Sequence, residues 1–343
     1  MSTPSNPRRA TILDVAGEAG VSRAAVSKVI RGADGVSDAM RTRVMDAIGR
    51  LDYRPSAAAR GLRGSSFTLG MELPTLTNPF LNEVAEGARA ALVGTAYQLV
   101  VAPADGSQQG AIESLVDHRV DGIIAVSPLV RREWLEELAA RAPLVMIGRH
   151  DDPIGYDTVV GDDVHGAESA MSHLVGLGHQ RIAHLTMSKA VTAKGIGTPH
   201  ELRLNTYLRC MKAAKLKAAV VQSSSVVQVD DDQPPAYDAT RALLNLPLPP
   251  TAIFAAHDSL AIAVLAAVAD AGLTARDVSV IGYDNTRLAG HPLISLTSVD
   301  QSGDELGRQA IAMLLERING RLEPRRYTAM PRLVVRNSTA PAP

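Results

Sequence analysis

Residues 11–31, TILDVAGEAGVSRAAVSKVIR, constrain the fold more than any other stretch, because they predict two short helices joined by a tight turn. The Thr11 hydroxyl is expected to cap the first helix, and Gly20 stands where a helix ends in a left-handed residue. Ser22 is expected to cap the second helix, whose outer face carries short donors and cations. Such a face suits a helix laid in a DNA major groove, although ordinary helical hairpins share the same apolar pattern.

The following residues predict a third helix and then a short segment that is not stable alone. Ser37 is expected to cap the third helix, which has an apolar stripe and ends near Tyr53. In residues 54–66, RPSAAARGLRGSS, the alanines favour a helix whereas Gly61 and Gly64 oppose it. A helix this short is expected to form only when it packs against another molecule or segment.

The charge of the chain is divided unevenly along its length. Residues 1–65 hold eleven Lys and Arg against six Asp and Glu, a net charge of +5. The whole chain has a formal net charge of −1, so the remaining 278 residues carry −6. A basic head on an acidic body predicts nucleic-acid binding at the N-terminal end only.

The length and composition limit the kinds of protein that this chain can be. A chain of 343 residues with 46% hydrophobic residues is long enough for two or three domains with full cores. Cys210 is the only cysteine, so no internal disulfide is expected, and the N-terminus has no apolar signal-peptide core. The longest apolar run, residues 260–269, is too short to span a bilayer, and the C-terminal NSTAPAP is expected to fray. We therefore expect a soluble cytoplasmic protein.

The sequence contains no motif of a known catalytic site. It has no P-loop, no G-x-G-x-x-G and no G-x-S-x-G, and its nine histidines are scattered rather than clustered with cysteines. We therefore expect no cofactor, no metal site and no enzymatic activity.

From Ser66 onward, short apolar runs alternate with amphipathic helical stretches. Repeated β-α units of this kind predict parallel sheets with helices on both faces. Because the strands are too many for one small sheet, we expect two lobes with a ligand cleft at the carboxyl ends of their strands. Buried strands are expected at 67–73, 97–102, 121–126, 143–148, 181–186, 217–222, 251–255, 278–283 and 296–299. Helices are expected at 80–93, 107–118, 131–140, 163–176, 201–214, 235–245, 257–271 and 301–318.

Several motifs resemble those of the lactose/galactose repressor family (LacI/GalR). TILDVA, AGVS and AVSKVI match its head, and VDGIIAVSP, FAAHDSLAIAVLAAV and DVSVIGYDN match its body. The resemblance covers about residues 10–335. It implies an all-α helix-turn-helix head at 1–53 and a hinge helix at 54–66. The remaining part, 67–343, is then a two-lobed α/β body that binds an effector, dimerises and resembles periplasmic sugar-binding proteins.

The resemblance also implies a function and a set of DNA contacts. Members of the family are transcriptional regulators, mostly repressors, which as homodimers bind double-stranded operator DNA and a small-molecule effector, usually a sugar or sugar derivative. The second helix reads the major groove, and a leucine of the hinge helix, here Leu62, unstacks a base step in the minor groove. The implied DNA-binding residues are Thr11, Ser22, Arg23, Ala24, Ser27, Lys28, Ala59 and Leu62.

Polar and aromatic residues near the ends of the predicted strands are candidates for the effector site. The resemblance implies that Phe80 stacks on the effector and that Arg203, with five donors, reaches it. Several candidates also have a structural alternative, such as a solvated turn residue for Asp105 or an ion pair for Arg149. The candidates are Phe80, Asp105, Arg149, Asp162, Arg203, His257 and Asp284.

The chain departs from the family pattern at several places. Lys28 stands where arginine is commoner, which weakens the case for bidentate recognition of guanine. His257 stands where asparagine is usual. Segment 187–201 is longer and less typical than the corresponding family loop, and we expect it to shape ligand specificity or to move with the ligand.

Two other functions share the expected body fold and stay open at this point. One is a sugar-binding protein without a regulatory role, and the other is a sugar-processing enzyme. Binding to duplex DNA at moderate salt distinguishes them from a regulator, since only a regulator requires it. The sequence also leaves open the effector, the operator and whether the effector releases or promotes DNA binding.

Overall fold

The structure is a computed structural model, and it describes residues 10–30, 35–53, 65–104, 109–214, 216, 226–229 and 233–343. The chain forms two compact units, Met1–Ser66 and Phe67–Pro343. Three candidate site residues, Ala59, Leu62 and Asp105, lie outside the described residues, and so do the hinge segment from 54 to 64 and the strand expected at 217–222.

The N-terminal unit contains the helix-turn-helix that the sequence predicts. The Thr11 hydroxyl accepts a hydrogen bond from the Asp14 N–H at 3.3 Å, and Gly20 ends the first helix with φ 62°. Ser22 Oγ accepts from the Ala25 N–H at 3.1 Å, so all three predicted helix ends are confirmed. The helices are α1 (Ile12–Ala19), α2 (Arg23–Ile30) and α3 (Asp38–Arg50), and their shared core consists of Val15, Ala16, Ala19, Val26, Val29, Val44, Ala47 and Tyr53.

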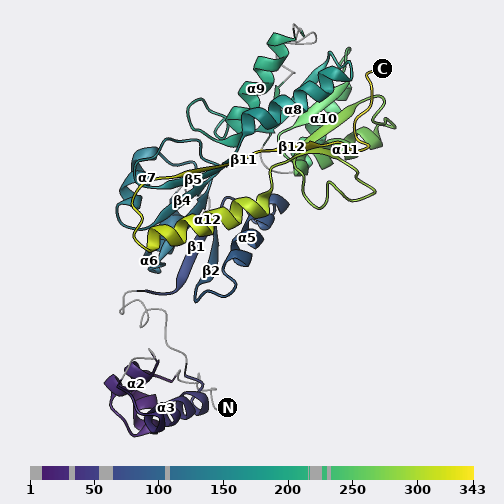
Figure 1. Cartoon of the computed structure of the whole chain (residues 1–343). Coiled ribbons are helices and arrows are strands. Elements are labelled where there is room, and N and C mark those ends of the chain that lie inside the picture. Colours follow the sequence, from purple (N-terminus) through teal and green to yellow (C-terminus); the bar gives the residue numbers. More distant parts are fainter. Residues whose placement is uncertain are drawn as a thin grey trace, which may run out of the picture. The chain divides into compact units, whose positions relative to one another are not determined.

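The first lobe of the second unit is a parallel sheet with helices on both faces (Figure 1). Its described strands are β1 (Thr68–Leu73), β2 (Gln98–Pro103), β3 (Gly122–Val126), β4 (Leu144–Ile147), β5 (Asp157–Gly161) and β11 (Arg326–Ala329), in the order β11-β5-β4-β3-β1-β2. Helices α5 (Pro79–Ala91) and α12 (Gly303–Ile318) pack on one face, and α6 (Gly110–Asp117) and α7 (Arg132–Ala139) pack on the other.

The second lobe repeats this arrangement with one antiparallel edge. Its described strands are β6 (Ile182–Met187), β7 (Val226–Val229), β8 (Ala252–Ala255), β9 (Ser279–Asp284), β10 (Thr297–Asp300) and β12 (Arg332–Val334), in the order β12-β10-β9-β8-β6-β7, with β12 antiparallel to β10. Helices α8 (Asp163–Gly176) and α9 (Pro199–Ala213) pack on one face, and α10 (Gln233–Leu244) and α11 (Asp258–Asp270) pack on the other. The predicted two-lobed α/β body is thereby confirmed. None of the described helices combines the length and apolarity that a bilayer crossing requires.

Among the described residues, three chain segments connect the two lobes. The chain passes from β5 to α8, returns from β10 to α12, and crosses again from β11 to β12. In Figure 1, β11 and β12 lie between the lobes, where the chain passes from one sheet to the other. Ligands of open α/β sheets bind outside the carboxyl ends of the strands, so these crossings frame the expected cleft.

Close packing of α5 against α12 positions the first residues of both helices (Figure 1). A Cβ added to Gly307 would lie 2.0 Å from a backbone oxygen of α5, and one added to Gly87 would lie 1.9 Å from a backbone oxygen of α12. Glycine therefore lets the two backbones approach more closely than a side chain permits. The same contact brings the Phe80 ring, at the start of α5, against Gly303, at the start of α12.

The sequence does not predict β5, β11 or β12, and none of the predicted strands coincides with β7. The apolar run of β5 is short and flanked by acidic residues, and β11 and β12 contain four and three residues. Each becomes a strand because a neighbour supplies its hydrogen bonds, as β4 and β11 do for β5. Such pairing overrides weak local propensity.

The C-terminal tail is packed, so the expectation that it frays is wrong. Ser338 is buried, and its Oγ accepts from the Thr297 N–H at 2.8 Å. The Ala342 N–H donates to the Leu177 oxygen at 2.9 Å. These backbone partners on the second lobe compensate for the small, polar side chains of the tail.

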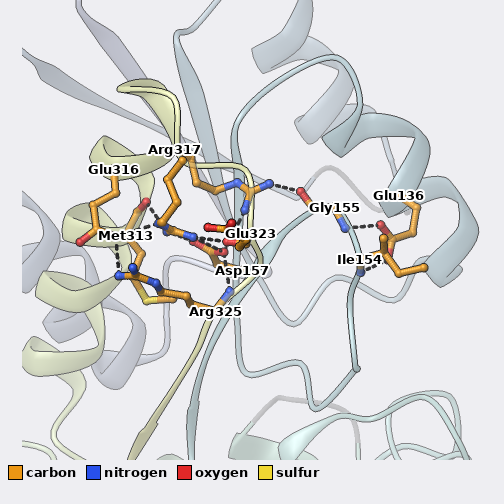
Figure 2. Close-up of polar contacts among 10 residues, drawn as sticks. Glu136, Ile154, Gly155, Asp157, Met313, Glu316, Arg317, Glu323 and Arg325 are labelled. Atoms are coloured by element: carbon orange, nitrogen blue, oxygen red, sulfur yellow. Dashed lines mark hydrogen bonds and ion pairs between the residues drawn. The ribbon is translucent and has the colours of Figure 1, made fainter.

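Asp157, at the start of β5, is a buried carboxylate that ties α12 and β11 to the sheet. Its side chain is 0% exposed and accepts from Arg317 Nη1 at 3.0 Å and from Arg321 Nη1 at 3.1 Å. The backbone N–H of Arg325 donates to the same carboxylate at 2.9 Å. Figure 2 shows Arg317, from α12, and Arg325, from the segment that precedes β11, beside Asp157. Removing one partner from such a group leaves a buried charge uncompensated.

Glu72, in β1, is expected to make stability depend on pH. Burial raises the pKa of Glu72 from 4.5 to about 7, and a hydrogen bond from the Val126 N–H opposes this only in part. Between these two pKa values the folded chain keeps a proton that the unfolded chain releases, so the wild type loses stability as the pH rises.

Replacing Glu72 with Gln should remove that loss. Relative to wild type, the variant should gain about 2–3 kcal/mol of unfolding free energy between pH 4.5 and pH 8. Urea unfolding of both proteins at the two pH values measures the difference. If the variant differs from wild type by the same amount at both, Glu72 does not keep its proton in the folded chain.

Candidate functional site

A cavity of about 160 Å³ lies between the two lobes of the second unit, at the carboxyl ends of their strands. This is the position at which open α/β folds bind ligands. Residues of the first lobe that line it include Phe80, Leu81, Val126, Leu129, Ile147 and Leu306, and those of the second lobe and the crossing segments include Asp163, His200, Arg203, His257, Asp284 and Gln301. One wall is therefore mainly apolar, and the other carries charged groups and imidazole rings.

Arg203, in α9, is the central cation of the polar wall. Its side chain is 3% exposed, and its Nε lies 2.8 Å from Asp163 Oδ1. Nη1 donates to the Ala256 oxygen at 2.7 Å, Nη2 donates to Gln301 Oε1 at 3.4 Å, and Cζ stands 3.5 Å from the centroid of the Tyr283 ring. These contacts hold the guanidinium plane in one orientation, which lowers the entropic cost of binding a ligand.

Asp163, the first residue of α8, balances the charge of Arg203. Burial alone would raise the pKa of Asp163, but the charge of Arg203 and the hydrogen bond with His150 hold it below its usual value. His150 Nε2 lies 2.9 Å from Asp163 Oδ2. The Asp163–Arg203 pair therefore offers the cavity oriented hydrogen-bonding groups with no net charge.

Asp284, the last residue of β9, is a buried carboxyl that favours its neutral form. Burial raises the pKa of Asp284 well above its usual range, the charge of Arg203 opposes this, and the neighbouring Asp258 raises it further. Asp284 Oδ1 accepts from Gln301 Nε2 at 2.6 Å. The backbone of Asp284 has φ 112°, a strained conformation of the kind that persists mainly at functional sites.

Two histidines, His200 and His257, lie on the same wall. Their ring centroids are 5.9 Å apart, in an edge-to-face arrangement. Burial lowers the pKa of His200 well below its usual value, and the charge of Arg203 lowers it further. A neutral imidazole has one donor and one acceptor nitrogen, so it suits a hydroxyl group of a ligand.

Phe80 supplies an aromatic surface from the apolar wall. Asn78 caps α5 by accepting the Phe80 N–H at 3.0 Å, and Pro79 occupies the first turn, where its missing N–H costs nothing. This cap orients the start of the helix so that the Phe80 ring lines the cavity. An apolar wall opposite a polar wall suits a small molecule with an apolar face and hydrogen-bonding edges.

Of the predicted effector residues, the structure brings Phe80, Arg203, His257 and Asp284 together around this cavity. It places Arg149 elsewhere, because Nη1 of that residue donates to the Pro128 oxygen at 2.9 Å and its Nε donates to Asp151 at 3.0 Å. Arg149 therefore forms an ion pair with Asp151, which is the structural alternative to ligand binding.

Asp162 also does not line the cavity. It caps α8 by accepting the His165 N–H at 2.9 Å, and the adjacent Asp163 lines the cavity instead. The remaining candidate, Asp105, lies outside the described residues.

Sequence reasoning missed three polar residues of the polar wall, Asp163, His200 and Gln301. Asp163 is one position beyond the predicted Asp162, and β5, which sets that boundary, is itself unpredicted. Gln301 directly follows β10, a strand that the sequence predicts, so its position just beyond a strand end could have identified it. His200 belongs to segment 187–201, for which the family pattern offers no guide. No group of three or more potential metal ligands is found among the described residues.

The N-terminal unit presents a candidate DNA-binding face on α2. Ser22, Arg23, Ala24 and Lys28 are exposed, and Ser27 is half-buried. Val26 and Val29 point into the core, so the polar side of α2 faces outward. Thr11 is exposed at the start of α1, where its hydroxyl also donates to Asp14 Oδ2 at 2.7 Å. An exposed helix with cations and short side chains has the chemistry of a major-groove reader.

Comparison with known proteins gives matches to both units. The profile of bacterial regulatory proteins of the lacI family matches residues 11–56, and that of the periplasmic binding protein-like domain matches residues 171–339. The ribose operon repressor of Escherichia coli K12 is 34% identical over 338 residues, which cover 96% of this chain and 99% of that protein.

Solved structures agree with this match. The complex of the transcriptional regulator CelR with cellobiose has 29% sequence identity and a TM-score of 0.68, covering 96% of this chain and 100% of that one. The lac repressor dimer bound to operator and an anti-inducer has 24% identity and a TM-score of 0.78, covering 97% and 100%, and it supports the fold. The chain therefore belongs to the lacI family of bacterial regulatory proteins and is a DNA-binding transcriptional regulator.

Proposed function

We propose that this protein is a transcriptional repressor whose operator binding is controlled by a small sugar bound in the cavity between the lobes. The observation that carries the proposal is the convergence of Phe80, Arg203, His257 and Asp284 on one cavity. These residues are scattered along the sequence, and their types suit a polyol with an apolar ring face.

The size of the cavity favours a single sugar ring. At about 160 Å³ it is close to engineered cavities of roughly 150 Å³ that hold benzene. A monosaccharide is therefore a better fit than a disaccharide such as the cellobiose of CelR. Since a ribose operon repressor is among the relatives, D-ribose is the first ligand to examine.

We further propose a homodimer that acts in the cytoplasm and has no catalytic activity. β2 is an edge strand in which Val100 and Val101 are 46% and 38% exposed, and a partner subunit would cover this apolar strip. The lac repressor, which shares the fold, is a dimer on its operator. A dimer places two heads on a two-fold symmetric site, with the segment at 54–66 and its Leu62 at the centre.

Replacing Arg23 with Ala tests the proposed DNA-reading face. The variant should lose about 1–3 kcal/mol of affinity for a duplex selected from a random-sequence pool, with relaxed preference at one base position. Fluorescence anisotropy at fixed salt measures the loss. Arg50→Ala is the matched control, because Arg50 Nε lies 3.0 Å from Glu18 Oε1 of α1 and faces a neighbouring helix instead.

The test compares the loss of affinity of the variant for the selected duplex with its loss for a duplex of random sequence. A base-reading residue affects mainly the selected duplex, whereas a phosphate contact affects both alike. Equal losses on the two duplexes for Arg23→Ala would reject the reading role of Arg23. Absence of any sequence enrichment by the wild-type chain would reject the proposed function itself.

A further inference from the structure

We infer that His150 is the first-lobe part of a latch that holds the two lobes together over the cavity, and that Asp163 links this latch to Arg203. His150 lies in the loop between β4 and β5. Its backbone N–H donates to the Gly197 backbone oxygen at 2.9 Å, and its ring Nε2 lies 2.9 Å from Asp163 Oδ2. Both partners belong to the second lobe or its junction, so one residue makes two contacts across the cleft. The latch consists of His150, Gly197 and Asp163.

The first lobe holds His150 in a fixed position. The preceding residue, Arg149, is 3% exposed, and its Nη1 donates to the Pro128 and Val130 oxygens at 2.9 and 3.1 Å. Its Nε donates to Asp151 Oδ2 at 3.0 Å, so the residues on both sides of His150 are tied down. The interactions of Arg149 thus orient its neighbour.

The second lobe presents Gly197 with equal precision. Both carboxylate oxygens of Glu201 accept backbone N–H groups, from Gly195 at 2.7 Å and from Gly197 at 2.8 Å. Thr198 Oγ1 donates to the Val191 oxygen at 2.7 Å, which closes the loop on itself. Because the loop is organised without His150, the interlobe hydrogen bond forms at little further entropic cost.

The latch is continuous with the cavity wall and with two crossing segments. Asp163 directly follows the crossing from β5 to α8, and its second oxygen accepts from Arg203 Nε at 2.8 Å. Arg203 in turn donates to Gln301, which lies on the crossing from β10 to α12. A change in the hydrogen bonds of Arg203 therefore reaches both the crossings and His150. This arrangement supplies a physical link between cavity occupancy and lobe closure, which a claim of coupling requires.

The test measures the distance between the lobes directly and needs no ligand. Spin labels are placed at Arg141→Cys in the first lobe and Lys212→Cys in the second, both exposed positions, in a chain whose own cysteine is replaced by Cys210→Ser. Labelled chains are diluted into unlabelled chains, so that pulsed electron paramagnetic resonance reports the distance between the two labels of one chain. The labelled chain that retains His150 should give a single narrow distribution of distances between the labels.

His150→Ala removes the side-chain half of the latch and should shift the distribution to longer, broader distances. His150→Gln retains a donor toward Asp163 and should restore the narrow distribution. A merely structural role within the first lobe would lower thermal stability without moving this interlobe distance. An unchanged distribution in His150→Ala would overturn the inference, and this result would leave the proposed sugar and operator binding untouched.

A measurement on the unmodified chain keeps the inference testable if His150→Ala does not fold. Hydrogen exchange should show the His150 backbone N–H protected well beyond an exposed loop, because its acceptor lies on the other lobe and the N–H exchanges only when the lobes separate. Exchange of this N–H at the rate of an exposed loop would contradict the latch.

Discussion

Arg203→Lys is expected to reduce affinity for the small-molecule ligand by roughly ten- to a hundredfold. Lysine keeps a positive charge beside Asp163 but loses the planar fork that contacts Ala256 and Gln301 and that, in the proposed complex, also contacts the ligand. The loss of a charge-assisted hydrogen bond costs about 1.5–3 kcal/mol, which corresponds to this change in affinity. Calorimetry with D-ribose, or with whichever sugar raises the melting temperature in a thermal-shift screen, measures it.

The choice of lysine separates ligand binding from folding. Arg203→Ala would leave the Asp163 carboxylate buried at 1% exposure without its main cation, and would destabilise the fold as well. Arg203→Lys should bind operator normally in the absence of ligand. Asp284→Asn should also weaken ligand binding, since an amide in place of the neutral carboxyl changes the donors and acceptors that the same wall offers. Unchanged affinity in both variants would place the ligand elsewhere.

The same two variants determine the sign of regulation. If the ligand is an inducer, they should stay on the operator when ligand is added. If it is a corepressor, they should fail to bind operator under the same conditions. Allosteric coupling is reciprocal, so operator should shift ligand affinity by the same factor in the wild type.

Asp157→Ala is expected to destabilise the chain by about 3–5 kcal/mol. The substitution leaves Arg317 and Arg321, with side chains only 8% and 10% exposed, without the carboxylate that they share. It also removes the acceptor of the Arg325 N–H, at the turn that leads into β11. Urea unfolding followed by circular dichroism measures the loss.

Asp152→Ala is the matched control for this prediction. Asp152 pairs with Arg326 at 3.6 Å, but its side chain is 93% exposed. Exposed ion pairs contribute about 0–1 kcal/mol, so the control should unfold close to wild type. Similar losses for the two variants would mean that the charge near β5, and not the burial of Asp157, determines the effect.

The parts of the fold that depend on local chemistry follow from the sequence. Thr11, Gly20 and Ser22 define helix ends through hydrogen bonds to their own neighbours, so their types and spacing suffice. Buried strands such as β3 and β4 are continuous apolar runs, which are readable without knowledge of the tertiary structure. Arg203 and Asp284 were placed in the site through motifs that resemble those of the family.

The parts that depend on tertiary pairing do not follow from the sequence. β5 is a strand only because β4 and β11 flank it, and its end determines that Asp163 and not Asp162 enters the cavity. Arg149 follows β4, as a ligand-binding residue would, yet its partners are carbonyl oxygens of another loop and the nearby Asp151. No sequence pattern distinguishes these two environments. The contact between His150 and Gly197 joins segments that have no recognisable motif.

The most direct test of the account is the operator affinity of the wild-type chain with and without saturating ligand. The measurement uses a duplex selected from a random pool and a sugar whose binding calorimetry has established. Fluorescence anisotropy should show a change of roughly 5- to 150-fold in operator affinity on adding the sugar, and no such change for Arg203→Lys at the same sugar concentration. An operator affinity that stays the same while the sugar occupies the wild-type chain would contradict the claim that the cavity controls the DNA-binding head.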